Sequence, residues 1–140
     1  MQKMNNKNKI FIDKLRSSGL RPTKQRVEIS RFLFNRKKTF HFTVEELKNS
    51  MNLKRSKKIS TATFYNTVHA LKSAGYLKEF SLENNTSYYD TNIKSHHHFF
   101  DNGKVIDIKS DKITFRKLPE APKGKKIKNV EVVIRLENNN

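Results

Sequence analysis

Three consecutive histidines, His96, His97 and His98, are the side chains in this sequence best suited to bind a metal ion. Side chains alternate between the two faces of a β-strand, so His96 and His98 would share one face and His97 would point to the other. Two imidazoles supply half of a site for Fe(II), Mn(II) or Zn(II), which accept mixed nitrogen and oxygen ligands. A complete site would need further ligands from elsewhere in the chain.

Two aspartates and one more histidine could complete such a site. Asp90 ends a predicted strand, and Asp107 lies in the strand predicted to pair with the histidine strand. His41 falls between two predicted helices. Because these ligands come from both halves of the chain, a bound ion could fix the angle between the halves and act as a switch.

Two other interpretations of the histidines remain open. Histidines exposed on a strand edge are often no more than polar surface. The run is also followed by Phe99 and Phe100, and aromatic surface beside potential axial ligands suits haem. The haem-binding candidates are then His96, His97 and His98.

A second group of residues has the pattern of a DNA-reading surface. A recognition helix needs an apolar side for docking and a polar side for base edges, and residues 61–69 supply both. Tyr65 could contact thymine methyl groups or a phosphate, and Asn66 could pair with adenine. Basic side chains, with Arg31 and Arg55 among them, could hold phosphates. The DNA-binding candidates are Arg21, Thr23, Lys24, Arg26, Lys57, Lys58, Thr61, Thr63, Tyr65, Asn66 and His69.

The charge of the chain also favours a polyanionic partner. Its 140 residues include 30 Lys and Arg but only 13 Asp and Glu, a net charge of +17. Residues 1–80 hold 19 basic and 5 acidic groups, whereas residues 81–140 hold 11 and 8. Polyanion binding is therefore expected mainly in the first half. The alternative from another class is a non-specific nucleoid or RNA-binding protein, which would bind with a steep salt dependence and no sequence preference.

Composition excludes several other functions. The absence of cysteine rules out disulfides, thiolate zinc sites, Fe–S clusters and catalytic thiols. A hydrolase could use a His/Asp metal site, but no paired nucleophile and base stands out, and four glycines leave no Gly-rich phosphate loop. We therefore predict no enzymatic activity. The N-terminus lacks the apolar stretch of a signal peptide, and no run approaches a membrane span, so a cytoplasmic protein is predicted.

The elements that must position these residues follow from apolar spacing and capping residues. Four helices are predicted: a short one around Ile10, Phe11 and Leu15, one from Pro22 and Thr23 to Phe34, one capped by Thr43 with Glu46, and one capped by Ser60. Two strands should follow, at residues 76–82 and 87–91, joined by a turn at residues 83–86. A hairpin is predicted at 96–100 and 104–108, a helical turn near Ser110, and a last strand at 130–136.

This order predicts an α+β fold with two domains. Residues 1–91 would form a winged helix-turn-helix DNA-binding domain, and residues 92–140 a small C-terminal α+β domain for dimerisation and for metal or haem sensing.

The chain resembles the ferric uptake regulator family, and within it the branch of the bacterial iron response regulators. The segments that carry the resemblance are LRPTKQRV (20–27), HFTVEEL (41–47), STATFYNTVHALKSAGYL (60–77), YYDTN (88–92), HHHFF (96–100) and VEVVIRL (130–136). The resemblance implies a homodimer that binds AT-rich inverted repeats near genes of iron and haem metabolism. It implies an iron- or haem-responsive regulator released from DNA by haem, or alternatively a repressor responding to Fe(II), Mn(II) or Zn(II).

The resemblance also implies roles for particular residues. The family's regulatory metal site falls on His41, Asp90, His96, His98 and Asp107, and the branch's haem motif on residues 96–98. The recognition-helix tyrosine falls on Tyr65, and the basic residue that reaches the minor groove falls on Arg21. The structural zinc site that many members build from paired CxxC motifs is absent here, because the chain has no cysteine.

Overall fold

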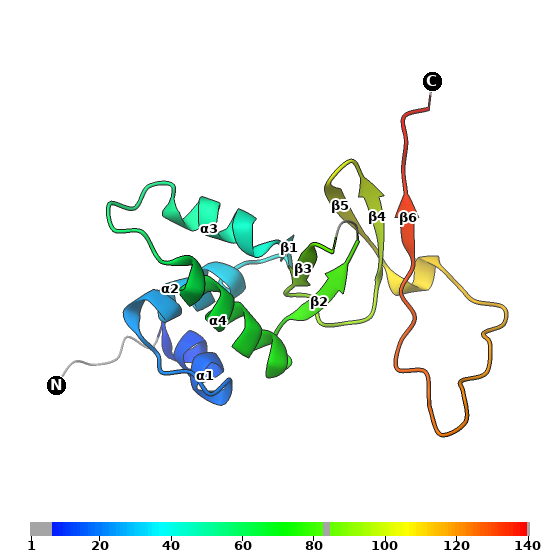
Figure 1. Cartoon of the computed structure of the whole chain (residues 1–140), viewed down its shortest axis with the longest axis horizontal. Coiled ribbons are helices and arrows are strands. Elements are labelled where there is room, and N and C mark those ends of the chain that lie inside the picture. The colour runs from blue at the N-terminus through cyan, green and yellow to red at the C-terminus, as the bar shows by residue number, and fades with distance from the viewer. Residues whose placement is uncertain (1–6, 83–84, 140) are drawn as a thin grey trace. The chain divides into compact units, whose positions relative to one another are not determined.

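The structure, a computed structural model, describes residues 7–82 and 85–139 and divides into two compact units, one ending at Ile93 and one beginning at Lys94 (Figure 1). The first unit contains α1 (Lys9–Ser17), α2 (Lys24–Phe34), β1 (His41–Phe42), α3 (Val44–Asn52), α4 (Thr61–Ser73), β2 (Lys78–Ser81) and β3 (Ser87–Asp90). The second contains β4 (His97–Asp101), β5 (Lys104–Ile108), the short 3-10 helix η1 (Ser110–Lys112) and β6 (Val133–Arg135). The predicted α+β class is confirmed. The domain boundary expected between residues 91 and 92 lies two residues before this division.

Three helices of the first unit begin at hydroxyl caps that the sequence predicts. Each capping side chain accepts a hydrogen bond of 3.1–3.3 Å from the backbone N–H three residues later, which satisfies a donor that has no partner within the helix. The caps are Thr23 for α2, Thr43 for α3 and Ser60 for α4.

One hydrophobic core holds the first unit together. Phe64, Val68 and Leu71 on the inner face of α4 are fully buried, as their spacing predicts. In α1 the residues Phe11 and Leu15 are buried, but Ile10 is 65% exposed, because it lies about a third of a turn away from the middle of the face that they share. The core cluster consists of Ile29, Leu33, Phe42, Val44, Leu47, Ile59, Phe64, Val68, Leu71, Leu77 and Tyr89.

The small sheet of the first unit has the order β1-β3-β2, and both pairings are antiparallel. Strands β2 and β3 correspond to the two predicted wing strands, each slightly shorter than expected. Residues 83 and 84 of the predicted turn lie outside the described residues. Strand β1 was not predicted, because two residues are too few to show an alternating pattern. It places His41 opposite Asp90 in the ladder.

The second unit is built on a three-stranded sheet of order β5-β4-β6. The predicted hairpin of β4 and β5 turns through Asn102 and Gly103, whose φ angles of 46° and 89° suit a two-residue hairpin turn. Strand β6 pairs in parallel with β4 and covers only the second part of the predicted strand 130–136. A long loop connects η1 to β6 (Figure 1). Among the described residues, no helix is both long and apolar enough to cross a membrane.

Candidate functional site

His96, His98 and Asp107 form a compact group of metal-ligating side chains in the second unit. The Nε2 atoms of both histidines lie 3.5 Å from Oδ1 of Asp107. The two imidazole rings have centroids 4.5 Å apart. The sheet register explains the grouping, because His98 in β4 is paired with Asp107 in β5, and His96 immediately precedes β4.

A hydrogen bond at Nδ1 of His96 orients the ring so that Nε2 is the nitrogen that could bind a cation. Nδ1 of His96 lies 2.7 Å from the carbonyl oxygen of Lys94. A carbonyl can only accept, so Nδ1 carries the proton, and in the neutral form of the ring the lone pair is at Nε2. Nε2 faces a carboxylate oxygen of Asp107 at 3.5 Å, and a metal ion between the two atoms could be bound by both. An imidazole held by a backbone carbonyl in this way is a recurrent arrangement at metal centres.

The spacing of the three side chains also fits a first-row divalent metal. Bonds from such ions to imidazole nitrogen and carboxylate oxygen are about 2.0–2.2 Å long, so two ligand atoms at a tetrahedral angle lie about 3.4 Å apart. The observed separations of 3.5 Å are close to this value. The donor set suits Fe(II), Mn(II) or Zn(II) and contains no thiolate.

His97 points away from this group, as strand alternation predicts. Its Nδ1 accepts a hydrogen bond of 2.9 Å from the backbone N–H of Val132, just before β6. Its ring meets Phe115 edge-on, with centroids 5.9 Å apart. His97 is buried by these contacts and ties the chain before and after the long loop to β4.

The two remaining predicted metal ligands meet in the first unit. His41 in β1 and Asp90 in β3 are directly opposite in the antiparallel ladder. Oδ1 of Asp90 accepts a hydrogen bond of 2.8 Å from the N–H of Asn92, which orients the carboxylate at the end of β3. Each unit thus assembles its own part of the predicted set of five ligands.

Helix α4 has the two faces expected of a recognition helix. Phe64, Val68 and Leu71 are buried in the core of the first unit. The opposite face exposes four of the predicted DNA-binding residues: Thr61, Tyr65, Asn66 and His69. Tyr65 is 46% exposed and contacts the ring of His69 edge-on, at 6.3 Å between centroids.

A groove of about 550 Å³ joins the first turn of α4 to the start of α2. Five predicted DNA-binding residues, three of them basic, line it, together with a glutamine, a glutamate and Arg55, which was expected to hold a phosphate. Arg21, just before α2, is exposed, and its carbonyl oxygen accepts a hydrogen bond of 3.1 Å from Nη1 of Arg26. The groove is lined by Thr23, Lys24, Gln25, Arg26, Glu28, Arg55, Lys57 and Thr63.

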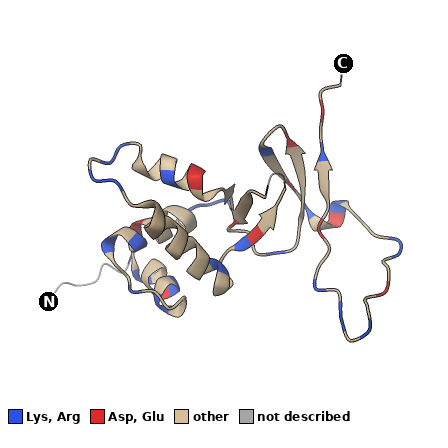
Figure 2. Ribbon diagram, viewed as in Figure 1, with Lys and Arg blue, Asp and Glu red and all other residues tan. Residues whose placement is uncertain are grey.

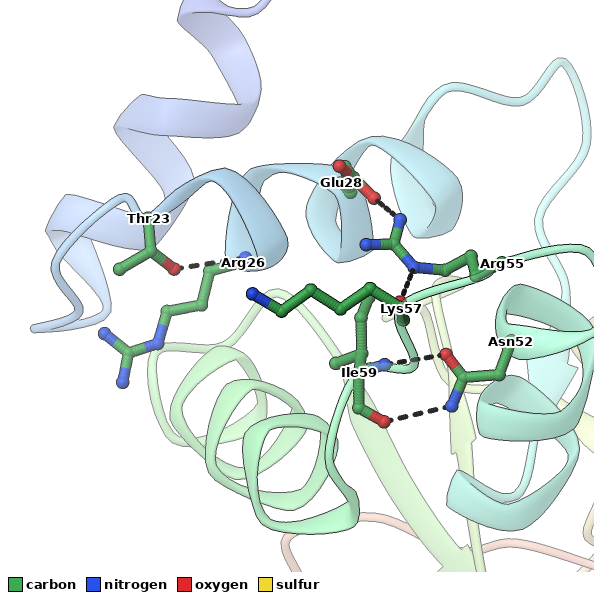
Figure 3. A network of polar contacts seen from close by, with 7 residues as sticks. All are labelled: Thr23, Arg26, Glu28, Asn52, Arg55, Lys57 and Ile59. Atoms are coloured by element: carbon green, nitrogen blue, oxygen red, sulfur yellow. Dashed lines mark hydrogen bonds and ion pairs between the residues drawn. The ribbon is translucent and has the colours of Figure 1, made fainter.

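The loop between α3 and α4 is held by a buried asparagine that the sequence did not single out (Figure 3). The side chain of Asn52 accepts a hydrogen bond of 2.9 Å from the N–H of Ile59 and donates one of 3.0 Å to its carbonyl oxygen. Asn52 and Ile59 are both buried, so the amide replaces the water that these backbone groups would otherwise bind. The sequence signal, a polar residue at the end of a helix, does not distinguish such a residue from an exposed one.

Two cations of this loop are engaged within the protein. Arg55 forms an ion pair with Glu28 of α2, and its Nε donates a hydrogen bond of 3.0 Å to the carbonyl oxygen of Lys57 (Figure 3). Nζ of Lys58 donates to the carbonyl oxygen of Asn52. Lys58 therefore turns to the end of α3, whereas Lys57 lines the groove.

A polar network ties α4 to both wing strands. Nζ of Lys72 lies 2.8 Å from Oε2 of Glu79 in β2, and Oγ of Ser87 in β3 donates a hydrogen bond of 3.0 Å to Oε1 of the same carboxylate. The hydrogen bond and charge of Lys72, opposed by partial burial, hold the pKa of Glu79 below its usual value. The wing is thereby fixed to the helix that carries Tyr65 and His69.

Comparison with known proteins agrees with this fold. The sequence model of the ferric uptake regulator family matches residues 17–135. A ferric uptake regulation protein from Synechococcus elongatus is 35% identical over 103 residues, which cover 71% of this chain and 69% of the relative. The peroxide-responsive repressor PerR from Staphylococcus epidermidis is 33% identical over 99 residues, covering 69% of this chain and 64% of the repressor.

A structural relative supports the fold. The structure of the ferric uptake regulator from Pseudomonas aeruginosa with manganese has a TM-score of 0.67 and 18% sequence identity, and the match covers 94% of this chain and 99% of that one. These similarities support the family without distinguishing the iron response regulator branch. The chain belongs to the ferric uptake regulator family, whose members are metal-responsive transcription regulators that bind DNA and are not enzymes.

Proposed function

We propose that this chain is a regulator of iron and haem metabolism genes that binds AT-rich inverted repeats as a homodimer and responds to a divalent metal ion. Residues 1–91 would read the DNA, and residues 92–140 would dimerise and take part in metal sensing. The observation that carries the sensing part is the grouping of His96, His98 and Asp107, with separations that suit an ion. The proposed ligands are His41, Asp90, His96, His98 and Asp107.

The metal would act by joining ligands from both units. An ion that binds better to one arrangement of the units than to another shifts the population towards the first. Coupling of this kind is reciprocal, so DNA must raise metal affinity by the same factor by which metal raises DNA affinity. The metal would thus report iron status through the strength of DNA binding.

On the DNA side, the groove and the exposed face of α4 would have different tasks. Lys24, Arg26 and Lys57 would neutralise phosphates and fix the register, as would Arg21 beside them. Tyr65 and Asn66 would contact base edges in the major groove, because they lie on the outer face of α4. The remaining proposed contacts are Thr23, Lys58, Thr61, Thr63 and His69.

Haem is the less well supported ligand for the same histidines. Among the three haem-binding candidates, His97 is already engaged within the protein, because its Nδ1 accepts the N–H of Val132 and its ring packs on Phe115. The other two rings face Asp107, an oxygen ligand that suits a bare divalent ion better than a porphyrin. We therefore favour the metal.

Calorimetric titration of the full chain with Mn(II) and Zn(II) tests the metal site. We expect Asp107→Asn to lower the affinity at least tenfold and Asp101→Asn, an aspartate of β4 outside the group, to leave it unchanged. His41→Ala and Asp90→Asn should weaken binding in the same direction if all five residues are ligands. Equal affinity for the Asp107 and Asp101 variants would refute the site. A parallel titration with haem is followed by absorbance. A Soret shift that saturates at a stoichiometric amount of haem would show that haem is a ligand of this protein.

Competition for a labelled AT-rich inverted repeat tests the DNA-binding part. The metal-loaded protein should be displaced from the repeat by the same unlabelled repeat at concentrations at which random DNA has no effect. Tyr65→Ala should reduce that preference, whereas Lys24→Gln should weaken binding to all duplexes alike. Equal competition by random DNA would instead favour the non-specific nucleoid protein.

A further inference from the structure

The long loop of the second unit carries the entire net charge of that unit. Residues 116–128 contain six Lys and Arg but a single acidic residue, Glu120. The remaining residues from Lys94 onward contain five basic and five acidic groups and are neutral as a set. We call residues 116–128 the basic loop. Its cations are Arg116, Lys117, Lys123, Lys125, Lys126 and Lys128.

These cations are displayed to solvent without counter-ions. All six side chains are exposed, and none forms an ion pair within the part of the chain that the structure describes. Figure 2 shows basic residues spaced along the loop that Figure 1 draws between η1 and β6. Like charges gathered on one short segment repel each other, and a polyanion would relieve that repulsion.

The basic loop is also held at its base. Before it, Phe115 packs on the ring of His97, and after it, the N–H of Val132 is bound by Nδ1 of the same histidine. Both ends are therefore fixed to β4 through one buried side chain. Within the loop, Pro119 and Pro122 restrict the backbone, and the N–H of Lys125 closes a turn on the carbonyl oxygen of Pro122. A loop held in this way loses less conformational entropy when it binds a partner.

We propose that the basic loop is a second DNA-contacting surface, which binds the phosphate backbone outside the bases read by α4. The proposal rests on the proposed DNA-binding function, because a duplex held by the first unit is a polyanion at high local concentration for the second. It assigns a role to His97, which the metal group does not use: His97 is a positioning residue for this loop. An anionic membrane surface is the competing partner, since Leu118 and Ile127 in the loop are 41% and 46% exposed.

The salt dependence of DNA binding by the full chain tests the proposal. Each phosphate contact contributes about 0.9 to the slope of log affinity against log salt concentration. Lys125→Gln, Lys126→Gln and Lys128→Gln together should lower the slope on a random 40-base-pair duplex by about 2 to 3. The matched control, Lys104→Gln, Lys109→Gln and Lys112→Gln, removes the same charge from the same unit and should lower it by less than about 1.

The outcomes separate this proposal from the proposed function. Equal slopes for the loop variant and the control overturn the role of the loop, whether or not the wild type prefers the inverted repeat. A lower slope for the loop variant supports that role even if the preference fails. If the loop variant keeps the wild-type slope on DNA but loses binding to phosphatidylserine vesicles that the control retains, the partner is a membrane and the DNA contact is refuted.

Discussion

Replacing Asn52 by alanine tests whether a single buried amide holds the loop that leads into the recognition helix. The side chain of Asn52 bonds to both the N–H and the carbonyl group of Ile59, at 2.9 and 3.0 Å. Ile59 is 1% exposed, so water cannot replace the lost amide without a rearrangement of the loop. Both backbone groups of Ile59 would be left buried without these partners.

The expected loss of stability follows from those two groups. A buried polar group without a partner costs about 1–3 kcal/mol, so the loss of partners for two groups should lower the free energy of unfolding by about 2–6 kcal/mol. In a domain of this size, 1 kcal/mol corresponds to about 4–8 °C in Tm, so Tm should fall by about 10 °C or more. A loss of this size is a large fraction of the about 5–15 kcal/mol that stabilises an ordinary domain.

Urea denaturation of the full chain, followed by tyrosine fluorescence, measures this loss. Asn49→Ala is the matched control, because Asn49 lies in the same helix but is exposed. The control should stay within about 0.5 kcal/mol of the wild type. If the Asn52 variant is as stable as the control, the loop does not depend on the amide and our reasoning is wrong. If it does not fold, hydrogen exchange of the wild type keeps the reasoning testable: the Ile59 amide should be protected because Asn52 accepts its N–H, and rapid exchange of that amide would contradict the role of Asn52.

Three further predictions concern other elements. The pKa of Glu79 is lowered chiefly by its hydrogen bond with Lys72, so the contribution of Glu79 to stability is present above the ordinary pKa of about 4.5 and disappears as the pH falls through the lower pKa of the folded state. In urea titrations between about pH 6 and pH 3, the wild type should therefore lose more stability than Glu79→Gln. Parallel curves of stability against pH for the two proteins would contradict this. Ser60→Ala removes the cap of α4 and should cost about 1 kcal/mol in thermal denaturation, with an unchanged Tm as the opposing result. His97→Ala should leave Mn(II) affinity within about threefold, since its Nδ1 faces the backbone before β6, but should cost the second unit about 1–3 kcal/mol. Hydrogen exchange of the β6 amides reports that loss, and unaltered protection would count against the role of His97.

Much of the fold could be predicted from local patterns in the sequence. The caps Thr23, Thr43 and Ser60 are recognisable because a hydroxyl at a helix start bonds a neighbouring amide, and such a bond needs no distant partner. The hairpin turn at Asn102 and Gly103 is local for the same reason. Strand alternation also separated His97 from His96 and His98, since the side-chain period of a strand is two residues.

What depends on distant contacts was decided by the tertiary structure alone. Strand β1 forms only because it pairs with β3, which lies far along the chain. This pairing brings His41 opposite Asp90. Asn52 is buried because the chain returns to it at Ile59. Arg55 forms an ion pair within the protein because Glu28 of another helix lies beside it. The three consecutive histidines show the difference most directly. Their sequence predicts metal binding, but only the ring contact with Phe115 and the hydrogen bond from Val132 show that His97 holds a loop.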